Sequence, residues 1–144
     1  MTAVVGRVFV VRWVRFSLAA LQAVRGEIST ARGLLDRRLV YLSLIPSTPR
    51  SFSGAERDAL AAYVRDLLVH DCASIHHVIE GTGFAVSARR SIVTNLAVAA
   101  ARPELFHTYA SFGDALLAIA GEVGEPGAGL VAELKRRDLG WPLP

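Results

Sequence analysis

Apolar positions along the chain alternate between two spacings, one typical of strands and the other of helices. Val8 to Arg15 is rich in β-branched and aromatic residues, which indicates a strand. Arg38 to Ile45 is a mostly apolar run, as expected of a strand covered on both faces. Between them, Ser17 to Leu35 carries apolar residues at near-helical spacing, which predicts an amphipathic helix.

The same alternation continues through the second half of the chain. Ser53 to Glu56 (SGAE) is a capping box, which predicts the start of a second helix. A third strand is expected over Ser74 to Glu80, a helix over about Ser87 to Arg102, and a short fourth strand over Leu105 to Ala110. Ser111 to Asp114 is a second capping signal, which predicts a further helix.

The resulting order, β-α-β-α-β-α-β-α, defines the expected fold class. Helical crossovers of this length join parallel strands, so we expect an α/β fold with a mainly parallel sheet of four or five strands. Residues 1–121 form the predicted domain. Residues 122–144 are predicted to be a C-terminal extension, glycine-rich at first and then forming a short helix over Leu130 to Arg137, which packs back, swaps to a second copy or stays mobile.

Composition narrows the classes of function. The chain has 144 residues, a net charge of only +3 and 52% hydrophobic residues, so it can form a core but lacks the strong basic patch typical of nucleic-acid binding. A single cysteine excludes an intramolecular disulfide and a cysteine-based metal cage, which favours the cytoplasm. Arginines interrupt the apolar N-terminus, and no uncharged run approaches the ~20 residues of a membrane span, so we expect neither a signal peptide nor a membrane anchor.

Three stretches carry a resemblance to a known family. They are Phe16 to Leu21 followed by RLVYLSLIPS, then HHVIEGTGFAVSARRSIVTNL, and finally LFHTYASFGDALLAIA. Together they resemble the STAS domains and their SpoIIAA-like relatives, the fold of the bacterial anti-sigma-factor antagonists, over roughly Gly6 to Gly121. The resemblance implies a non-enzymatic bacterial regulatory or scaffolding module whose third helix and neighbouring loop bind a protein partner.

The family's phosphorylated serine maps onto this chain only in part. The antagonists have a loop that reads like F-M-D-S-S-G, and Phe84-Ala85-Val86-Ser87-Ala88 stands at that place. Phe84 and Ser87 match, whereas Val86 replaces the aspartate, and the second serine and the glycine are missing. The resemblance makes Ser87 a candidate phosphoacceptor; from the sequence pattern alone, Ser87 is expected to be the N-cap of its helix.

The turn before this helix and the start of the helix form the predicted contact surface. Two arginines in the expected first turn oppose the helix dipole. They are therefore expected to bind an anion, to extend into solvent, or to pair with Glu80 or Asp71. The predicted partner- or anion-binding residues are Thr82, Gly83, Phe84, Ser87, Arg89 and Arg90.

The sequence gives only weak signals for a nucleotide site, a metal site or a cysteine nucleophile. Gly81-Thr82-Gly83 lacks the third glycine of a dinucleotide loop and follows the wrong strand. The histidines His70, His76, His77 and His107 form no metal-ligand pattern, because neighbours in a strand point to opposite faces. Cys72 is expected to be a small buried hydrophobe, the alternative being a nucleophile paired with His70 or His107. We therefore expect no cofactor, no metal and no catalytic residue.

Two other functions remain open. The first is a carrier for a small lipid-like or anionic ligand, held between helix and sheet in a pocket lined by Phe84, Ile92 and Phe106. The second is an enzyme with a composite Cys/His site. A homodimer is a further expectation, because Trp141 in the tail is suited to anchor a second copy or another partner.

Overall fold

The computed structural model describes residues 1–14, 16–45, 52–81, 83–99, 101–124 and 127–137, and their side chains except those of 84, 85, 89, 96, 97, 99, 127 and 128. One five-stranded sheet runs through this part of the chain, with the strands in the order of the sequence. The strands are β1 (Thr2–Val5), β2 (Val8–Arg12), β3 (Leu39–Ile45), β4 (Cys72–Ile79) and β5 (Phe106–Tyr109). β1 pairs antiparallel with β2, and β2 through β5 are parallel.

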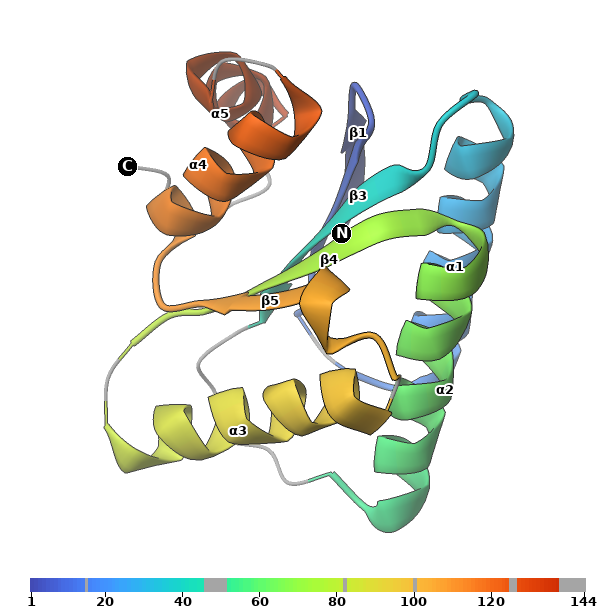
Figure 1. Cartoon of the computed structure of the whole chain (residues 1–144), viewed down its shortest axis with the longest axis vertical. Helices are drawn as coiled ribbons and strands as arrows, with labels where there is room; N and C mark the ends of the chain where they lie inside the picture. Colours follow the sequence, from blue (N-terminus) through green and yellow to red (C-terminus); the bar gives the residue numbers. More distant parts are fainter. Residues whose placement is uncertain (15, 46–51, 82, 100, 125–126, 138–144) are drawn as a thin grey trace.

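Helices cover both faces of this sheet (Figure 1). They are α1 (Leu18–Gly33), α2 (Gly54–His70), α3 (Phe84–Ala99), α4 (Phe112–Val123) and α5 (Gly127–Arg136), with a short 3-10 turn, η1 (Pro103–Leu105), before β5. Three successive crossovers move along the sheet in one direction, so right-handed connections place α1, α2 and α3 on the same face. α4 and α5 follow the last parallel strand and pack on the other face.

Two apolar layers result, one on each side of the sheet. On the α1–α3 face, Phe9, Tyr41 and Ile75 pack against Ile28 and Leu67 of the helices. On the α4–α5 face, the sheet meets apolar residues of both helices, among them Phe112, Leu116, Leu130 and Leu134. The prediction of an α/β fold with a mainly parallel sheet is confirmed.

Side-chain caps fix where several helices begin. Ser53 and Glu56 form the predicted capping box at α2, with Ser53 Oγ accepting from Glu56 N and Glu56 Oε2 accepting from Ser53 N. Ser111 caps α4 as predicted, and Ser17 caps α1 in the same way. The sequence signals for these starts are local, which is why they could be read correctly.

The two ends of the chain differ from the sequence analysis. The sequence pattern predicts no strand before Val8, whereas the structure forms β1 there. The predicted boundary after residue 121 lies inside the last turn of α4, which ends at Gly124 in the left-handed conformation (φ 72°). Beyond it, Leu130 and Leu134 of α5 are buried in the core, so this part of the extension packs back onto the domain. Among the described helices, none combines the length and apolar character needed to cross a bilayer.

Candidate functional site

The turn between β4 and α3, which carries most of the predicted contact residues, is built on two glycines. Gly81 and Gly83 have φ angles of 104° and 97°, which side-chain-bearing residues rarely adopt. α3 starts at Phe84, and the amide of Ser87 donates to Gly83 O at 3.1 Å. Ser87 is therefore the fourth residue of the helix and not its N-cap, so that prediction was wrong. Its side chain is exposed.

The arginines of α3 lie one turn further into the helix than predicted. Arg89 and Arg90 are in the second turn, where the dipole of the helix start acts less strongly on them. Arg90 pairs with neither Glu80 nor Asp71; its Nη2 donates to Ile79 O at 2.8 Å and to Gly81 O at 2.9 Å. Arg90 therefore ties α3 to the end of β4. Thr82 and the side chains of Phe84 and Arg89 lie outside the described residues.

The outer face of α3 differs in charge from the other helices. Every exposed α3 side chain that the structure describes is uncharged: Ser87, Ala88, Ser91, Thr94, Asn95 and Val98. By contrast, α1 exposes Glu27, α2 exposes Arg57, Asp58 and Arg65, and α5 exposes Lys135 and Arg136. The inner face of α3 packs on the core through Val86 and Val93. In its described part, the outer face of α3 thus consists of neutral and mostly small side chains.

On the opposite face of the sheet, the structure assembles a polar cluster that the sequence analysis missed. Glu122, in the last turn of α4, accepts from Ser74 Oγ at 2.7 and 2.8 Å and lies 3.0 Å from His76 Nε2. His76 Nδ1 lies 3.1 Å from Tyr109 Oη, and the His107 ring is 5.0 Å from that of His76. The hydrogen bond with His76 holds the pKa of Glu122 below its usual range, against the effect of burial.

This cluster contains serine, histidine and glutamate, but its geometry differs from that of a catalytic triad. Ser74 Oγ and Glu122 both contact His76 Nε2, whereas in a triad the carboxylate binds the other ring nitrogen. Ser74 is 3% exposed and donates directly to Glu122. Arg7 Nη2 also donates to Glu122 O at 2.8 Å. These contacts attach the end of α4 to β4 and to the β1–β2 turn.

A second polar group lies on the α1–α3 face, in the carboxyl-terminal half of the parallel strands. In the sheet register, Ser43, His77 and Thr108 are neighbours across β3, β4 and β5. His77 is 8% exposed, and its ring lies 6.2 Å from that of Tyr41 and 4.7 Å from that of Phe106. Ser43 Oγ accepts from Trp13 Nε1 at 3.0 Å. We call Ser43, His77 and Thr108 the polar row.

The polar row interrupts layers that are otherwise apolar. On the same face of the sheet, two residues before the row, lie Tyr41, Ile75 and Phe106. Two residues after it lie Ile45 and Ile79. Among the described residues, neither ring nitrogen of His77 has a hydrogen-bond partner. Burial lowers the pKa of His77 to about 3, with a smaller contribution from His76, so the ring is neutral at physiological pH.

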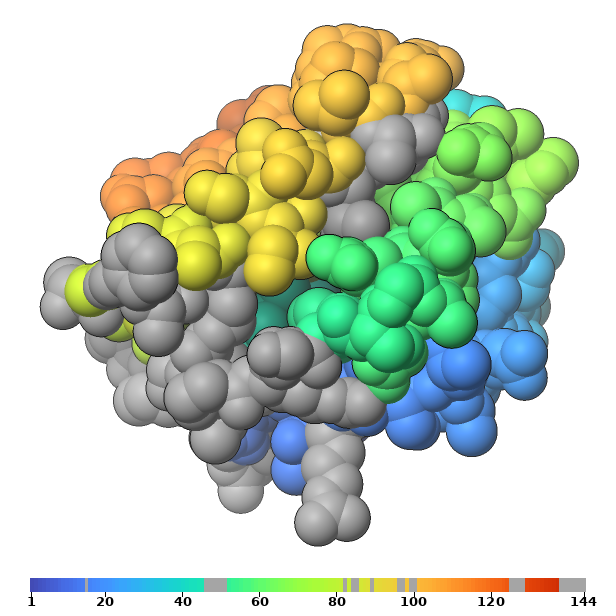
Figure 2. Space-filling view, turned by 90° about the horizontal axis from the view of Figure 1, so that it is seen from below, coloured from blue at the N-terminus to red at the C-terminus, as the bar shows by residue number. Residues whose placement is uncertain are grey.

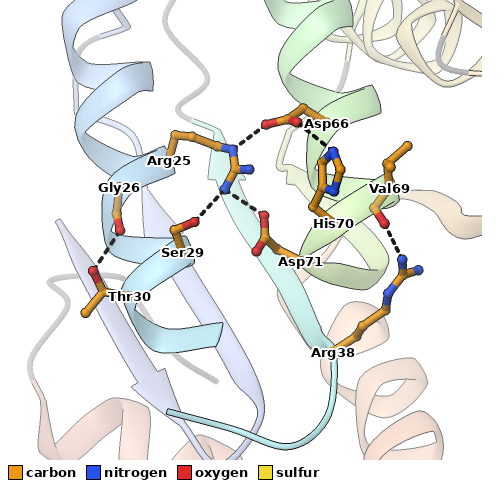
Figure 3. Close-up of polar contacts among 9 residues, drawn as sticks. All are labelled: Arg25, Gly26, Ser29, Thr30, Arg38, Asp66, Val69, His70 and Asp71. Atoms are coloured by element: carbon orange, nitrogen blue, oxygen red, sulfur yellow. Dashed lines mark hydrogen bonds and ion pairs between the residues drawn. The ribbon is translucent and has the colours of Figure 1, made fainter. Parts of the chain in front are cut away.

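At the other end of the strands, a network of ion pairs joins α1 to the last turns of α2 and to its C-cap, Asp71 (Figure 3). Arg25 Nε lies 2.5 Å from Asp66, and Arg25 Nη1 lies 2.6 Å from the buried Asp71. His70 Nε2 lies 3.5 Å from Asp66, and Arg38 donates to the carbonyl of Val69. Because these contacts lie at the amino-terminal ends of β3 and β4, away from the polar row, we assign them to stability.

The histidines of β4 and Cys72 lie where the sequence predicts. His76 and His77 face opposite sides of the sheet, as predicted. Cys72 is a buried member of the core, also as predicted, and burial raises its pKa to about 12, which disfavours a thiolate. Within the described part of the chain, no three His, Cys, Asp or Glu side chains are arranged to hold a metal ion.

With this geometry in place, the chain can be compared with known proteins. No family model matches the sequence, and neither the curated proteins nor the solved structures contain a significant match. The STAS or SpoIIAA-like resemblance therefore stays a prediction. What is established is the α/β class, the mainly parallel five-stranded sheet and the helices on both of its faces.

Proposed function

We propose that the chain is a regulatory or scaffolding module of the bacterial cytoplasm, with a STAS-like fold, that binds a protein partner through the outer face of α3. The observation that carries this proposal is the lack of charge among the exposed α3 side chains that the structure describes. The centres of protein interfaces are depleted of charged residues, and the described outer face of α3 shares that feature. Small side chains also let a second backbone approach closely.

The local structure supports this role because it holds α3 in place. Arg90 links the helix to the carbonyls of Ile79 and Gly81, and Val86 and Val93 anchor its inner face. A helix fixed in this way loses little conformational entropy when a partner binds, which favours affinity. The partner surface that fits it best is itself uncharged and free of large protruding side chains.

Ser87 gives this surface a means of regulation. Ser87 is exposed, and it lies at the start of the described outer face of α3. A phosphate there would add about two negative charges to a neutral contact surface, and desolvating them would oppose binding. In this proposal, the unmodified form binds the partner and the phosphorylated form releases it.

The test is a comparison of three tagged versions of this chain expressed in the source cells, with quantitative mass spectrometry of the proteins that co-purify. Ser91→Arg introduces a charge into the α3 face, and Ala62→Arg introduces the same charge into the exposed face of α2. We expect a specific partner that is retained by wild type and Ala62→Arg and lost at least about tenfold with Ser91→Arg. Equal recovery with both variants would contradict the proposed surface.

A further inference from the structure

Burying the ring of His77 without hydrogen-bond partners lowers the stability of the fold. A neutral imidazole has one donor nitrogen and one acceptor nitrogen, and buried polar atoms in folded proteins nearly always have partners. His77 is 8% exposed, and both of its nitrogens lack a partner among the described residues. An apolar side chain would pack against Tyr41 and Phe106 without this cost. A position that keeps an unpaired polar group in the core is typical of a functional site.

His77 has polar neighbours on both adjacent strands of the sheet. It lies in the carboxyl-terminal half of β4, between Ser43 and Thr108 on the neighbouring parallel strands. Figure 2 shows the surface hollowed between α2 and α3, with part of β3 at the bottom of the hollow. α2 and α3 cover the face of the sheet on which the polar row lies.

We infer that the layer between the sheet and helices α2 and α3 binds a small, uncharged aromatic molecule carrying a hydroxyl or amide group, with His77 as its hydrogen-bonding anchor. A hydroxyl or an amide donates and accepts at once, which matches the two nitrogens of a neutral imidazole. The rings of Tyr41 and Phe106 on either side of His77 favour an aromatic body. This site lies on the inner side of α3 and is separate from the outer face proposed for the protein partner.

Phenol is the simplest probe with this chemistry, and two relatives of similar size test its parts. Toluene keeps the ring and lacks the hydroxyl, and benzoate replaces the hydroxyl with a charge. Each is titrated into the full chain labelled with nitrogen-15 in its histidines, and the ring resonances are followed by NMR. We expect phenol to cause saturable shifts of both His77 ring nitrogens. Toluene should bind about tenfold more weakly, because it leaves the imidazole unpaired, and benzoate should not bind.

Two variants assign the binding to His77, and backbone amide resonances report on binding to each of them. His77→Phe keeps a ring of similar shape and removes both nitrogens, so phenol should bind about tenfold more weakly or not at all. His107→Gln removes an imidazole from the other face of the sheet and should bind phenol as wild type does. The thermal unfolding transition of each variant shows whether it is folded. The inference is overturned if phenol gives no saturable shift, if benzoate binds more tightly than phenol, or if folded His77→Phe binds phenol as wild type does.

Discussion

His76 and His77 are adjacent in β4, yet their rings lie in different layers of the molecule. His76 contacts Glu122 and Tyr109 beneath α4, with each ring nitrogen in a polar contact. His77 lies between Tyr41 and Phe106 on the side of α2 and α3, with neither ring nitrogen paired among the described residues. The alternation of side chains along a strand thus gives two identical residues opposite environments.

The first prediction concerns the pH dependence that His77 imposes on stability. Its pKa falls from about 6.5 in the unfolded chain to about 3 in the folded one. Below pH 6.5, His77 binds a proton in the unfolded chain but not in the folded chain. The free energy of unfolding therefore decreases by about 1.4 kcal/mol per pH unit as the pH falls. Urea unfolding of wild type and His77→Phe at pH 7, 6 and 5 measures this slope.

His77→Phe should lose that slope and should be about 1 kcal/mol more stable at pH 7, since an unpaired buried ring is replaced by an apolar one. His107 must be measured alongside, because burial and the charge of His76 also lower its pKa. The His107→Gln variant should keep most of the slope. Parallel pH profiles for wild type and His77→Phe would refute the assignment to His77.

The second prediction concerns Glu122, which attaches the end of α4 to the sheet. The hydrogen bond with His76 lowers the pKa of Glu122, so its carboxylate stabilises the fold above its unfolded pKa of about 4.5. That contribution is lost as the pH falls through the lower folded pKa. Glu122→Gln should cost about 1 kcal/mol at pH 7, and the difference from wild type should vanish at low pH. Denaturant unfolding at pH 7, 4 and 3 provides the measurement. A stability difference between wild type and Glu122→Gln that is as large at pH 3 as at pH 7 would show that the charge of Glu122 is not its cause.

The third prediction concerns the ion pair between Arg25 and Asp71. Asp71 is 6% exposed, so Arg25→Ala removes the paired guanidinium from a buried carboxylate. Arg25→Ala should destabilise the fold by about 3 kcal/mol. Thr30→Ala, on the exposed side of the same helix, is the matched control and should change stability by less than about 0.5 kcal/mol. A loss below about 1 kcal/mol for Arg25→Ala would mean that Asp71 is solvated or paired in another way.

The fourth prediction compares two serines at helix starts. Ser53 closes the capping box of α2, and Ser53→Ala should cost about 1 kcal/mol. Ser87 is the fourth residue of α3 with an exposed side chain, so Ser87→Ala should change stability by less than about 0.5 kcal/mol. Thermal and urea unfolding of the two variants decide the point. Similar losses of stability for both variants would contradict the placement of Ser87 inside α3.

These residues also show what the sequence could and could not predict. The capping box at Ser53 and the strand from Leu39 to Ile45 depend on local patterns, and both were predicted correctly. Ser87 was misplaced because α3 starts three residues before it, directly after Gly83, and a serine inside a helix has the same sequence appearance as a serine at its cap.

Both polar clusters depend on contacts between distant segments. Glu122 lies 48 residues beyond Ser74, and the polar row exists only in the register of three strands. Neither relationship has a local signature. The sequence held one partial signal, which is the pair of adjacent histidines inside a mostly apolar strand. Side-chain alternation places them on opposite faces of the sheet but cannot show what each face contains.

The central claim, that α3 carries the partner-binding surface, is tested most directly by site-specific photocrosslinking in the source cells. A photoreactive phenylalanine analogue replaces Asn95 on the outer face of α3 or, as the control, Ala62 on the exposed face of α2. The account predicts a discrete crosslinked product containing a second protein for position 95, and none for position 62. The same product from both positions, or none from position 95 in a chain that remains folded, would contradict the account.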